Sequence, residues 1–394
     1  MNFSIRIPKG IGSTLFFAAI IYLLLVSGGF FPYAPEDWMK GAVKGGVLVG
    51  FGVIFFSTRL KRSIVRPLSC FLLLGFLIGV FGLFRARDLG MALEKVEGAV
   101  FCSAAVAFIW YQGHQKFGWR KINFAFVFFS FIVLLATVAY KLQFGFFDRA
   151  TRFFLSGPIV YGWIMGLSAL VSLFLWEREK NMTYVFFFLS FSFAMVWTES
   201  KGAIVAFAVA FAFYSVYVFR NNPRIAIFGL LCLLASWFFL FDDFLRFVED
   251  SRFAAIGRFL GGELGAVDDG SIGVRTILIN KALEDVWINP VSGIGLTGFV
   301  FDEYVYPHNQ HLEVFVELGI FVGVLHLFFL MFSFYRASPN LKAIIIFFIV
   351  AGSFSGDMSY LRFLYAFCLL AFVGATVTAR WNLATSKDEA SRMA

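Results

Sequence analysis

Charged residues are scarce in this 394-residue chain: they make up 15% of it, against about a quarter in ordinary soluble domains. Hydrophobic residues make up 60%, the mean hydropathy is +0.81, and 57 residues are phenylalanine. No water-soluble fold could bury so many large apolar side chains, so the composition excludes an ordinary soluble domain and indicates a membrane protein. Basic loops on one membrane face explain the net charge of +8 better than nucleic-acid binding does.

Cysteine is also sparse, and the four residues of this type lie far apart inside apolar runs: Cys70, Cys102, Cys232 and Cys368. No C-x-x-C pair is present, so neither a zinc site nor a redox site is indicated, and small apolar fillers are expected. The sequence shows no internal repeat and no low-complexity linker. We therefore expect one membrane domain over residues 1–394.

Long apolar runs dominate what remains, and each is long enough, at about 16–22 residues, to cross a hydrocarbon core as a helix. They lie near residues 11–30, 41–57, 67–84, 97–111, 122–140, 158–176, 182–198, 202–219, 225–241, 311–334, 341–357 and 360–378. The sequence thus predicts an all-α polytopic membrane protein with about twelve transmembrane helices. One long extracytoplasmic loop, 242–310, is expected before the tenth.

The short loops predict the orientation. If the N-terminus is cytoplasmic, more than half of the 33 basic residues lie in inner loops and tails, as the positive-inside rule requires. Both termini are then cytoplasmic and the 242–310 loop is outside. Within that loop we expect short helices, among them an amphipathic helix over Val274–Leu283, and part of an active site.

Two cations on this outer face are candidates for function. Lys201 begins an apolar run, where a charge is costly unless it has a role or a partner; an ion pair with Glu199 or a snorkelling side chain explains it equally well. Arg275 lies in the long loop, where a solvated charge is the plain interpretation. Its guanidinium could instead donate two parallel hydrogen bonds to a phosphate.

The polar run Tyr306-Pro307-His308-Asn309 leads directly into the tenth apolar run and places an imidazole at a membrane surface. His308 and His311 are three residues apart and share a helix face, but no third ligand has the spacing of a metal site. His326, five helical turns further on, is expected to lie too deep to cooperate with His308.

Glu313 and Glu317 are four residues apart and share a different helix face from His308. We expect them to pair with basic groups of neighbouring helices rather than to act on a substrate.

Three motifs, in order along residues 182–335, resemble the O-antigen ligase and polymerase superfamily. They are Ser200-Lys201-Gly202-Ala203, the turn Asn289-Pro290 through Gly293-Ile294-Gly295, and Tyr306-Pro307-His308-Asn309 followed by Leu312-Glu313 and Glu317-Leu318-Gly319. The chain departs from the family pattern in two places. Lys201 stands where the family usually has Arg, and the second glycine after Gly319 arrives late, at Gly323.

The resemblance implies transfer of a glycan from undecaprenyl diphosphate to an acceptor hydroxyl, outside the inner membrane of a bacterium. It implies His308 as general base and Lys201 and Arg275 as ligands of the diphosphate, with possible support from Ser200, Asn309 and His311. No cofactor and no metal are expected, and the sequence has no Asp-x-Asp motif of a nucleotide-sugar site. The partners implied are the lipid-linked donor, a lipid A–core or other glycan acceptor, and membrane lipids.

Three functions stay open at this point. An O-antigen ligase is the first choice, because the outer region is dominated by one loop. A polymerase of O-antigen or exopolysaccharide would carry the same motifs and use a second lipid-linked glycan as acceptor. A transporter of lipid-linked glycans is the alternative from another class, although the chain has no inverted repeat.

Overall fold

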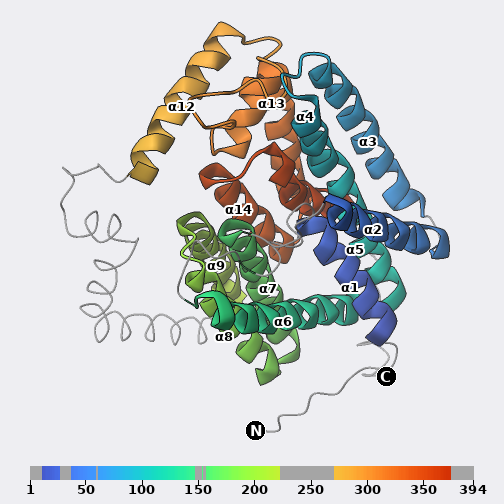
Figure 1. Ribbon diagram of the computed structural model, residues 1–394. Helices are drawn as coiled ribbons and strands as arrows, with labels where there is room; N and C mark the ends of the chain where they lie inside the picture. The colour runs from blue at the N-terminus through green and yellow to red at the C-terminus, as the bar shows by residue number, and fades with distance from the viewer. Residues whose placement is uncertain are drawn as a thin grey trace.

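The computed structural model describes residues 11–26, 37–58, 61–146, 153, 157–221 and 270–373, which form helices and connecting turns without a β-strand. The helices are α1 (Ile11–Val26), α2 (Asp37–Ser57), α3 (Arg62–Leu83), α4 (Leu89–Val96), the π-helix η1 (Glu97–Cys102), α5 (Ser103–Phe117), α6 (Trp119–Phe144), α7 (Pro158–Glu179), α8 (Met182–Trp197), α9 (Lys201–Asn221), α12 (Gly270–Ile288), α13 (Gln310–Arg336), α14 (Pro339–Phe354) and the 3-10 helix η2 (Met358–Tyr360), after which residues 361–373 are helical (Figure 1).

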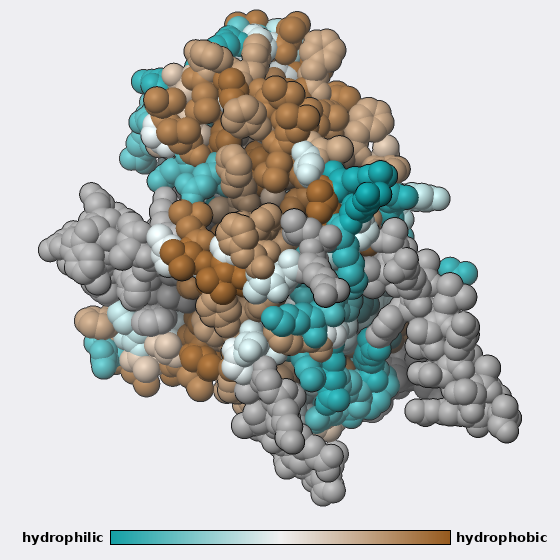
Figure 2. All heavy atoms as spheres, turned by 90° about the vertical axis from the view of Figure 1, so that its right-hand side faces the viewer, coloured by the Kyte–Doolittle hydropathy of each residue, from teal (hydrophilic) through white to brown (hydrophobic). Residues whose placement is uncertain are grey.

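The all-helical membrane architecture is confirmed, whereas the count of twelve spans is not. Five described helices are long and apolar enough to cross a membrane, namely α3, α6, α7, α9 and α13, and five shorter apolar helices accompany them. The predicted span 225–241 lies outside the described residues. Figure 2 shows an apolar surface over the face that carries α3, whose Leu73, Phe76, Leu77 and Phe81 are exposed.

The predicted short span 97–111 is the middle of a longer helical stretch. The elements α4, η1 and α5 follow one another without a break from Leu89 to Phe117. The π-helical turn lets the stretch change phase between α4 and α5, and such turns often accompany functional sites. Its upstream end places Lys95 against α13.

Around α7 the helices form the core. It packs against α6, α8, α9 and α14, and its large side chains Tyr161 and Trp163 are enclosed. The start of α9 and the end of α14 lie side by side, because Gly202 allows the backbone to approach Phe354.

The tenth predicted span, 311–334, is not one straight helix. At Gly319 the backbone takes φ 83° and ψ 172°, which reverses the chain. His311 lies 2.9 Å from His326, and the Phe315 ring lies against Gly323. In a straight helix His311 and His326 would be about 22 Å apart. The region is therefore a hairpin of a half-helix, 310–318, and a longer arm, 320–336.

The Asn-Pro-x-x-Gly-x-Gly turn closes the tip of this hairpin. Backbone amides of Ile294 and Gly295 donate to the carbonyls of Val316 and Glu317, at 2.9 and 3.0 Å. These carbonyls would otherwise be unpaired at the end of the half-helix. Gly293, with φ 64°, touches the Glu317 backbone, and a side chain there would collide with it. Two motifs of the sequence thus form one structural unit.

The predicted amphipathic helix over Val274–Leu283 is confirmed as part of α12, which is longer at both ends. Its buried face carries Leu278 and Ala282, which pack with Phe299 and Val316. The first part of the predicted outer loop, residues 242–269, lies outside the described residues. This packing places α12 over the half-helix and over the loop that precedes it.

Candidate active site

His308 lies just before the half-helix, in a backbone conformation with φ 53° that side chains rarely adopt. Its ring is half-buried between two tyrosines, with ring centroids 4.4 Å from Tyr306 and 5.8 Å from Tyr304. Its Nδ1 atom is buried and has no hydrogen-bond partner among the described residues. The chain thus holds an imidazole with an unengaged nitrogen in a fixed place.

Arg275, on α12, is the cation that the structure brings to His308. Burial lowers the pKa of His308, and the positive charge of Arg275 lowers that pKa further. Burial also raises the pKa of Tyr306 to about 12, Asp357 and Tyr360 add to the rise, and Arg275 opposes it. At neutral pH the site therefore presents a neutral imidazole and a neutral phenol beside a guanidinium.

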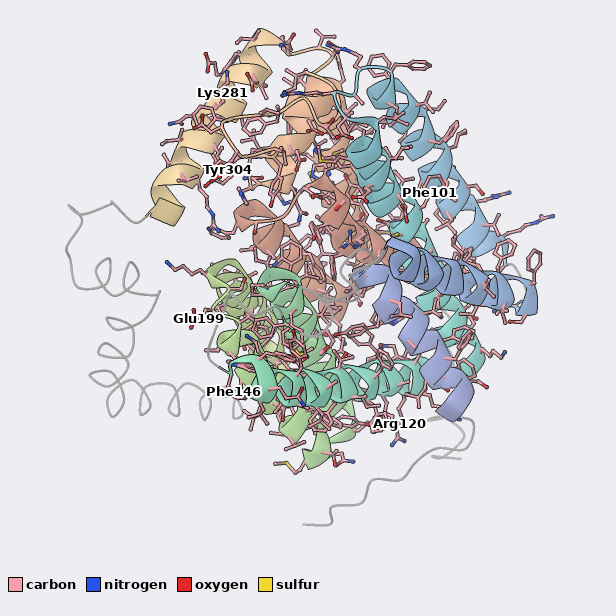
Figure 3. All side chains as sticks on the ribbon, viewed as in Figure 1. Phe101, Arg120, Phe146, Glu199, Lys281 and Tyr304 are labelled. Carbon is pink, nitrogen blue, oxygen red and sulfur yellow. The ribbon has the colours of Figure 1, made fainter. Side chains whose placement is uncertain are left out.

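Lys201 begins α9 and is half-buried at the end of α14. The same end of α14 reaches the half-helix, since Gln310 Nε2 donates to the carbonyl of Ser355 at 3.3 Å. In Figure 3, Glu199 at the α8–α9 junction and Tyr304 before α13 lie on the same side of the molecule. The start of α9, where Lys201 lies, and the start of the half-helix thus both adjoin the end of α14.

Ser200 and Asn309 have structural places in turns. Ser200 is buried in the α8–α9 turn, where its backbone N–H donates to Thr198 Oγ1 at 3.2 Å. Asn309 is the N-cap of the half-helix, and its side-chain oxygen accepts from the amides of His311 and Leu312, both at 3.1 Å. The cap holds the residue next to His308 in its extended conformation.

His311 does not point where its spacing predicted. Its Nδ1 contacts His326 Nε2, and its Nε2 lies 2.9 Å from the carbonyl oxygen of Ile349. Both ring nitrogens are engaged, so His311 has no free nitrogen for an acceptor hydroxyl. The expectation that His326 lies too deep to cooperate assumed a straight helix; the reversal at Gly319 brings it to His311 instead.

Glu313 and Glu317 are fully buried and share one cation. Nζ of Lys95, on α4, lies 2.5 Å from Glu313 Oε1 and 2.6 Å from Glu317 Oε1. The prediction that these carboxylates pair with a basic group of a neighbouring helix is confirmed. The ion pairs hold the half-helix against α4.

Several residues of this site were not predicted. Lys95 had a signal, because it is a lone lysine at the edge of an apolar stretch. The tyrosines around His308 had a weaker one, since Tyr304 and Tyr306 precede it closely in sequence. Tyr365, which contacts His326, had none, because it lies in an apolar run far along the chain.

The described residues hold no cluster of three His, Cys, Asp or Glu side chains close enough to bind a metal ion together. Among the described residues, Arg275 is the charged group whose field lowers the pKa of His308. The site can therefore bind anions, through Arg275, beside a proton acceptor.

A comparison with protein families finds a match over the part of the chain that carries the candidate site. Residues 185–327 match the family model described as O-Antigen ligase, and a search of curated proteins found no match. The matched segment runs from α8 into the longer arm of α13, and it contains Lys201, Arg275 and His308. This match over 185–327 covers all three sequence motifs, and it supports the resemblance of the chain to the O-antigen ligase and polymerase superfamily.

Proposed function

We propose that this protein is an O-antigen ligase. It transfers a glycan from undecaprenyl diphosphate to a hydroxyl of a lipid A–core acceptor, on the periplasmic face of a bacterial inner membrane. The observation that carries the proposal is His308: an imidazole with an unengaged nitrogen, fixed beside Arg275, inside the segment that matches the family. A general base and a fixed cation are what this transfer needs.

His308 acts on the acceptor. Its ring nitrogen takes the proton of the acceptor hydroxyl as the oxygen attacks the anomeric carbon of the donor sugar. The bond between that carbon and the phosphate oxygen breaks, and the diphosphate leaves with the electron pair. The imidazolium later returns its proton to water. Because its pKa is lowered, His308 is already deprotonated at neutral pH and is ready to accept.

Arg275 and Lys201 act on the donor. The departing diphosphate gains negative charge, and fixed cations stabilise that charge more in the transition state than in the ground state. Arg275 offers a planar fork with two donors, and Lys201 offers a compact charge. With both cations in place, we propose that the reaction proceeds without a divalent metal.

The test is turnover by the purified protein in proteoliposomes, with a lipid-linked glycan donor and two acceptors in separate reactions. Transfer to lipid A–core supports the ligase, and transfer only to a second lipid-linked glycan supports the polymerase instead. Movement of the donor across the bilayer without any transfer would indicate the transporter. Excess EDTA should leave the rate unchanged; loss that Mg²⁺ restores would overturn the metal-free mechanism.

The proposed orientation has its own test. Glu284, on α12, has a side chain that is 62% exposed, so Glu284→Cys can be labelled in a variant that lacks the four native cysteines. An impermeant thiol reagent should label it in cells with an intact inner membrane. Labelling only after that membrane is permeabilised would place the site on the wrong side for this donor.

A further inference from the structure

Three side chains form a hydrogen-bonded chain behind the half-helix. The phenol oxygen of Tyr365 lies 2.7 Å from His326 Nδ1, and His326 Nε2 lies 2.9 Å from His311 Nδ1. His311 Nε2 ends the chain, 2.9 Å from the carbonyl oxygen of Ile349. The proposed reaction uses none of these four groups.

The direction of each hydrogen bond follows from the last one. A carbonyl oxygen only accepts, so His311 Nε2 must carry the proton, and in a neutral ring its Nδ1 is an acceptor. His326 Nε2 must then donate, which leaves His326 Nδ1 as an acceptor for the Tyr365 hydroxyl. All three bonds are satisfied by two neutral rings of the same tautomer. A cationic ring would place a charge among buried apolar groups, at high cost.

The chain ties together four parts of the fold. His311 belongs to the half-helix, His326 to the longer arm of α13, Tyr365 to the last described helix and Ile349 to α14. The aromatic rings of Phe71 and Phe329 hold Tyr365 from two sides, with centroids 5.7 and 5.4 Å away. The half-helix can therefore neither rotate nor slide without breaking a buried hydrogen bond.

We propose that His326 and Tyr365 are positioning residues that fix His308 through His311. His308 precedes the capped half-helix directly, so a small displacement of His311 is transmitted to the imidazole. The inference rests on the proposed role of His308 as base. The chain does not supply protons, because it ends on a backbone carbonyl and the structure shows no hydrogen bond from its members to His308.

The first test reads the tautomers without any assay of transfer. The protein has only four histidines, so ¹⁵N-histidine labelling gives few signals. The variants His114→Gln and His308→Gln assign these signals by subtraction. We expect His311 and His326 to be neutral, with protonated Nε2 and unprotonated Nδ1. Tyr365→Phe should move the Nδ1 signal of His326 and leave the His114 signals in place. A protonated Nδ1 on His326 would overturn the chain as described.

The second test is kinetic. His326→Leu removes both hydrogen bonds, and a misplacement of about 1 Å at the reacting atoms costs up to about 10²-fold in rate. We expect kcat to fall by about 10- to 100-fold while KM for donor and acceptor changes little. His326→Gln can donate to His311 and accept from Tyr365, so it should recover much of the loss. Equal losses in the Leu and Gln variants would contradict positioning through hydrogen bonds.

Tyr365→Phe keeps the ring and removes one hydroxyl, so it provides a mild variant if His326→Leu does not fold. Its kcat should fall by about 3- to 10-fold, in line with one hydrogen bond of about 1 kcal/mol. His114→Gln, which removes a histidine elsewhere, should keep normal kcat. Unchanged kcat in Tyr365→Phe, together with a shifted His326 signal, would show that the chain exists but does not position His308.

A double variant separates this inference from the proposed function. If His326 acts through His308, adding His326→Leu to His308→Ala should lower the residual rate no further. A further 10-fold loss would mean that His326 acts by another route. Normal transfer by His308→Ala would instead refute the base itself, whatever the tautomers show.

Discussion

The loop before the half-helix and the half-helix itself each carry a histidine, and the two imidazoles have opposite environments. His308 keeps a nitrogen without a protein partner, beside a guanidinium, in a strained backbone. Three residues later, His311 has both nitrogens engaged and joins two arms of a hairpin. Their spacing alone placed the two residues on one helix face. Their hydrogen-bond partners separate a group available for chemistry from one committed to the fold.

The same division extends to charge. Arg275 lies on the side of the half-helix that faces His308, where its charge acts on the imidazole. Lys95 lies on the side that faces α4, where two carboxylates enclose it. The charge of Arg275 acts on the imidazole, whereas the charge of Lys95 is neutralised by the two carboxylates. Under the proposed function, the half-helix thus separates a reactive surface, next to His308, from a structural one, next to Lys95.

Removing the imidazole of His308 should have the largest effect on transfer. We expect His308→Ala to lower kcat by about 10²–10⁴-fold, the range for losing a positioned proton acceptor. Expression and membrane insertion should be normal, because Nδ1 of His308 makes no hydrogen bond within the described part of the chain. Single-turnover rates of the purified variants measure this.

The contrast between His308 and His311 is tested by comparing the transfer rates of variants at the two positions. His311→Gln keeps a donor for the Ile349 carbonyl and should retain more activity than His308→Ala. Near-normal transfer by His308→Ala, with complete loss in His311→Gln that still folds, would make His311 the base.

The structural surface is tested by Lys95→Met. This change leaves two buried carboxylates without their cation, and breaking a buried pair costs about 3–5 kcal/mol. Thermal unfolding of the purified variant in detergent should show the loss. Adding Glu313→Gln and Glu317→Gln to Lys95→Met should restore part of the stability, since no unpaired charge is then buried. Equal stability of Lys95→Met and the wild type would show that the ion pairs do not stabilise the hairpin.

The reactive surface is tested by pH. As the proposed base, His308 would act in its neutral form, and its pKa is lowered from 6.5, so the rate should fall only on acidification below that value. Arg275→Gln removes a positive charge that favours the neutral ring, so the pKa should rise and the acidic limb should move to higher pH. Arg275→Lys keeps the charge and should leave the limb in place, although it loses the fork. The measurement is kcat/KM as a function of pH for each variant. An acidic limb that does not move in Arg275→Gln would mean that Arg275 and His308 do not interact.

The smallest effect is expected at the cap. Asn309→Ala removes the side chain that accepts two amides at the start of the half-helix, at a cost of about 1 kcal/mol. Asn309→Asp should retain most of that energy. Chemical denaturation of both variants measures the difference, and a stabilised Ala variant would contradict the cap.

Much of this arrangement was predictable from the sequence. Apolar runs revealed the helical membrane fold, and the resemblance to the family selected Arg275 and His308 before their proximity was known. The hairpin was not predictable, because 311–334 is one unbroken apolar run and a reversal at Gly319 depends on a positive φ that composition does not report. One error followed from it: His326 was placed out of reach, although it contacts His311.

The hairpin also sets the depth of the site. In the proposed orientation, the turn between Arg336 and Ser338 lies at the inner surface of the membrane. His326 is ten residues from one end of that turn and Ile349 eleven from the other, so both lie about 15 Å above it at 1.5 Å per residue. His311 touches both of them, and the hydrocarbon core is about 30 Å thick. In that orientation, the imidazole three residues before it lies below the outer surface of the membrane, nearer to mid-bilayer. Under the proposed function, an acceptor sugar would have to reach that depth on its own glycan chain, so the length of that glycan, as well as its terminal hydroxyl, would decide which acceptors are used.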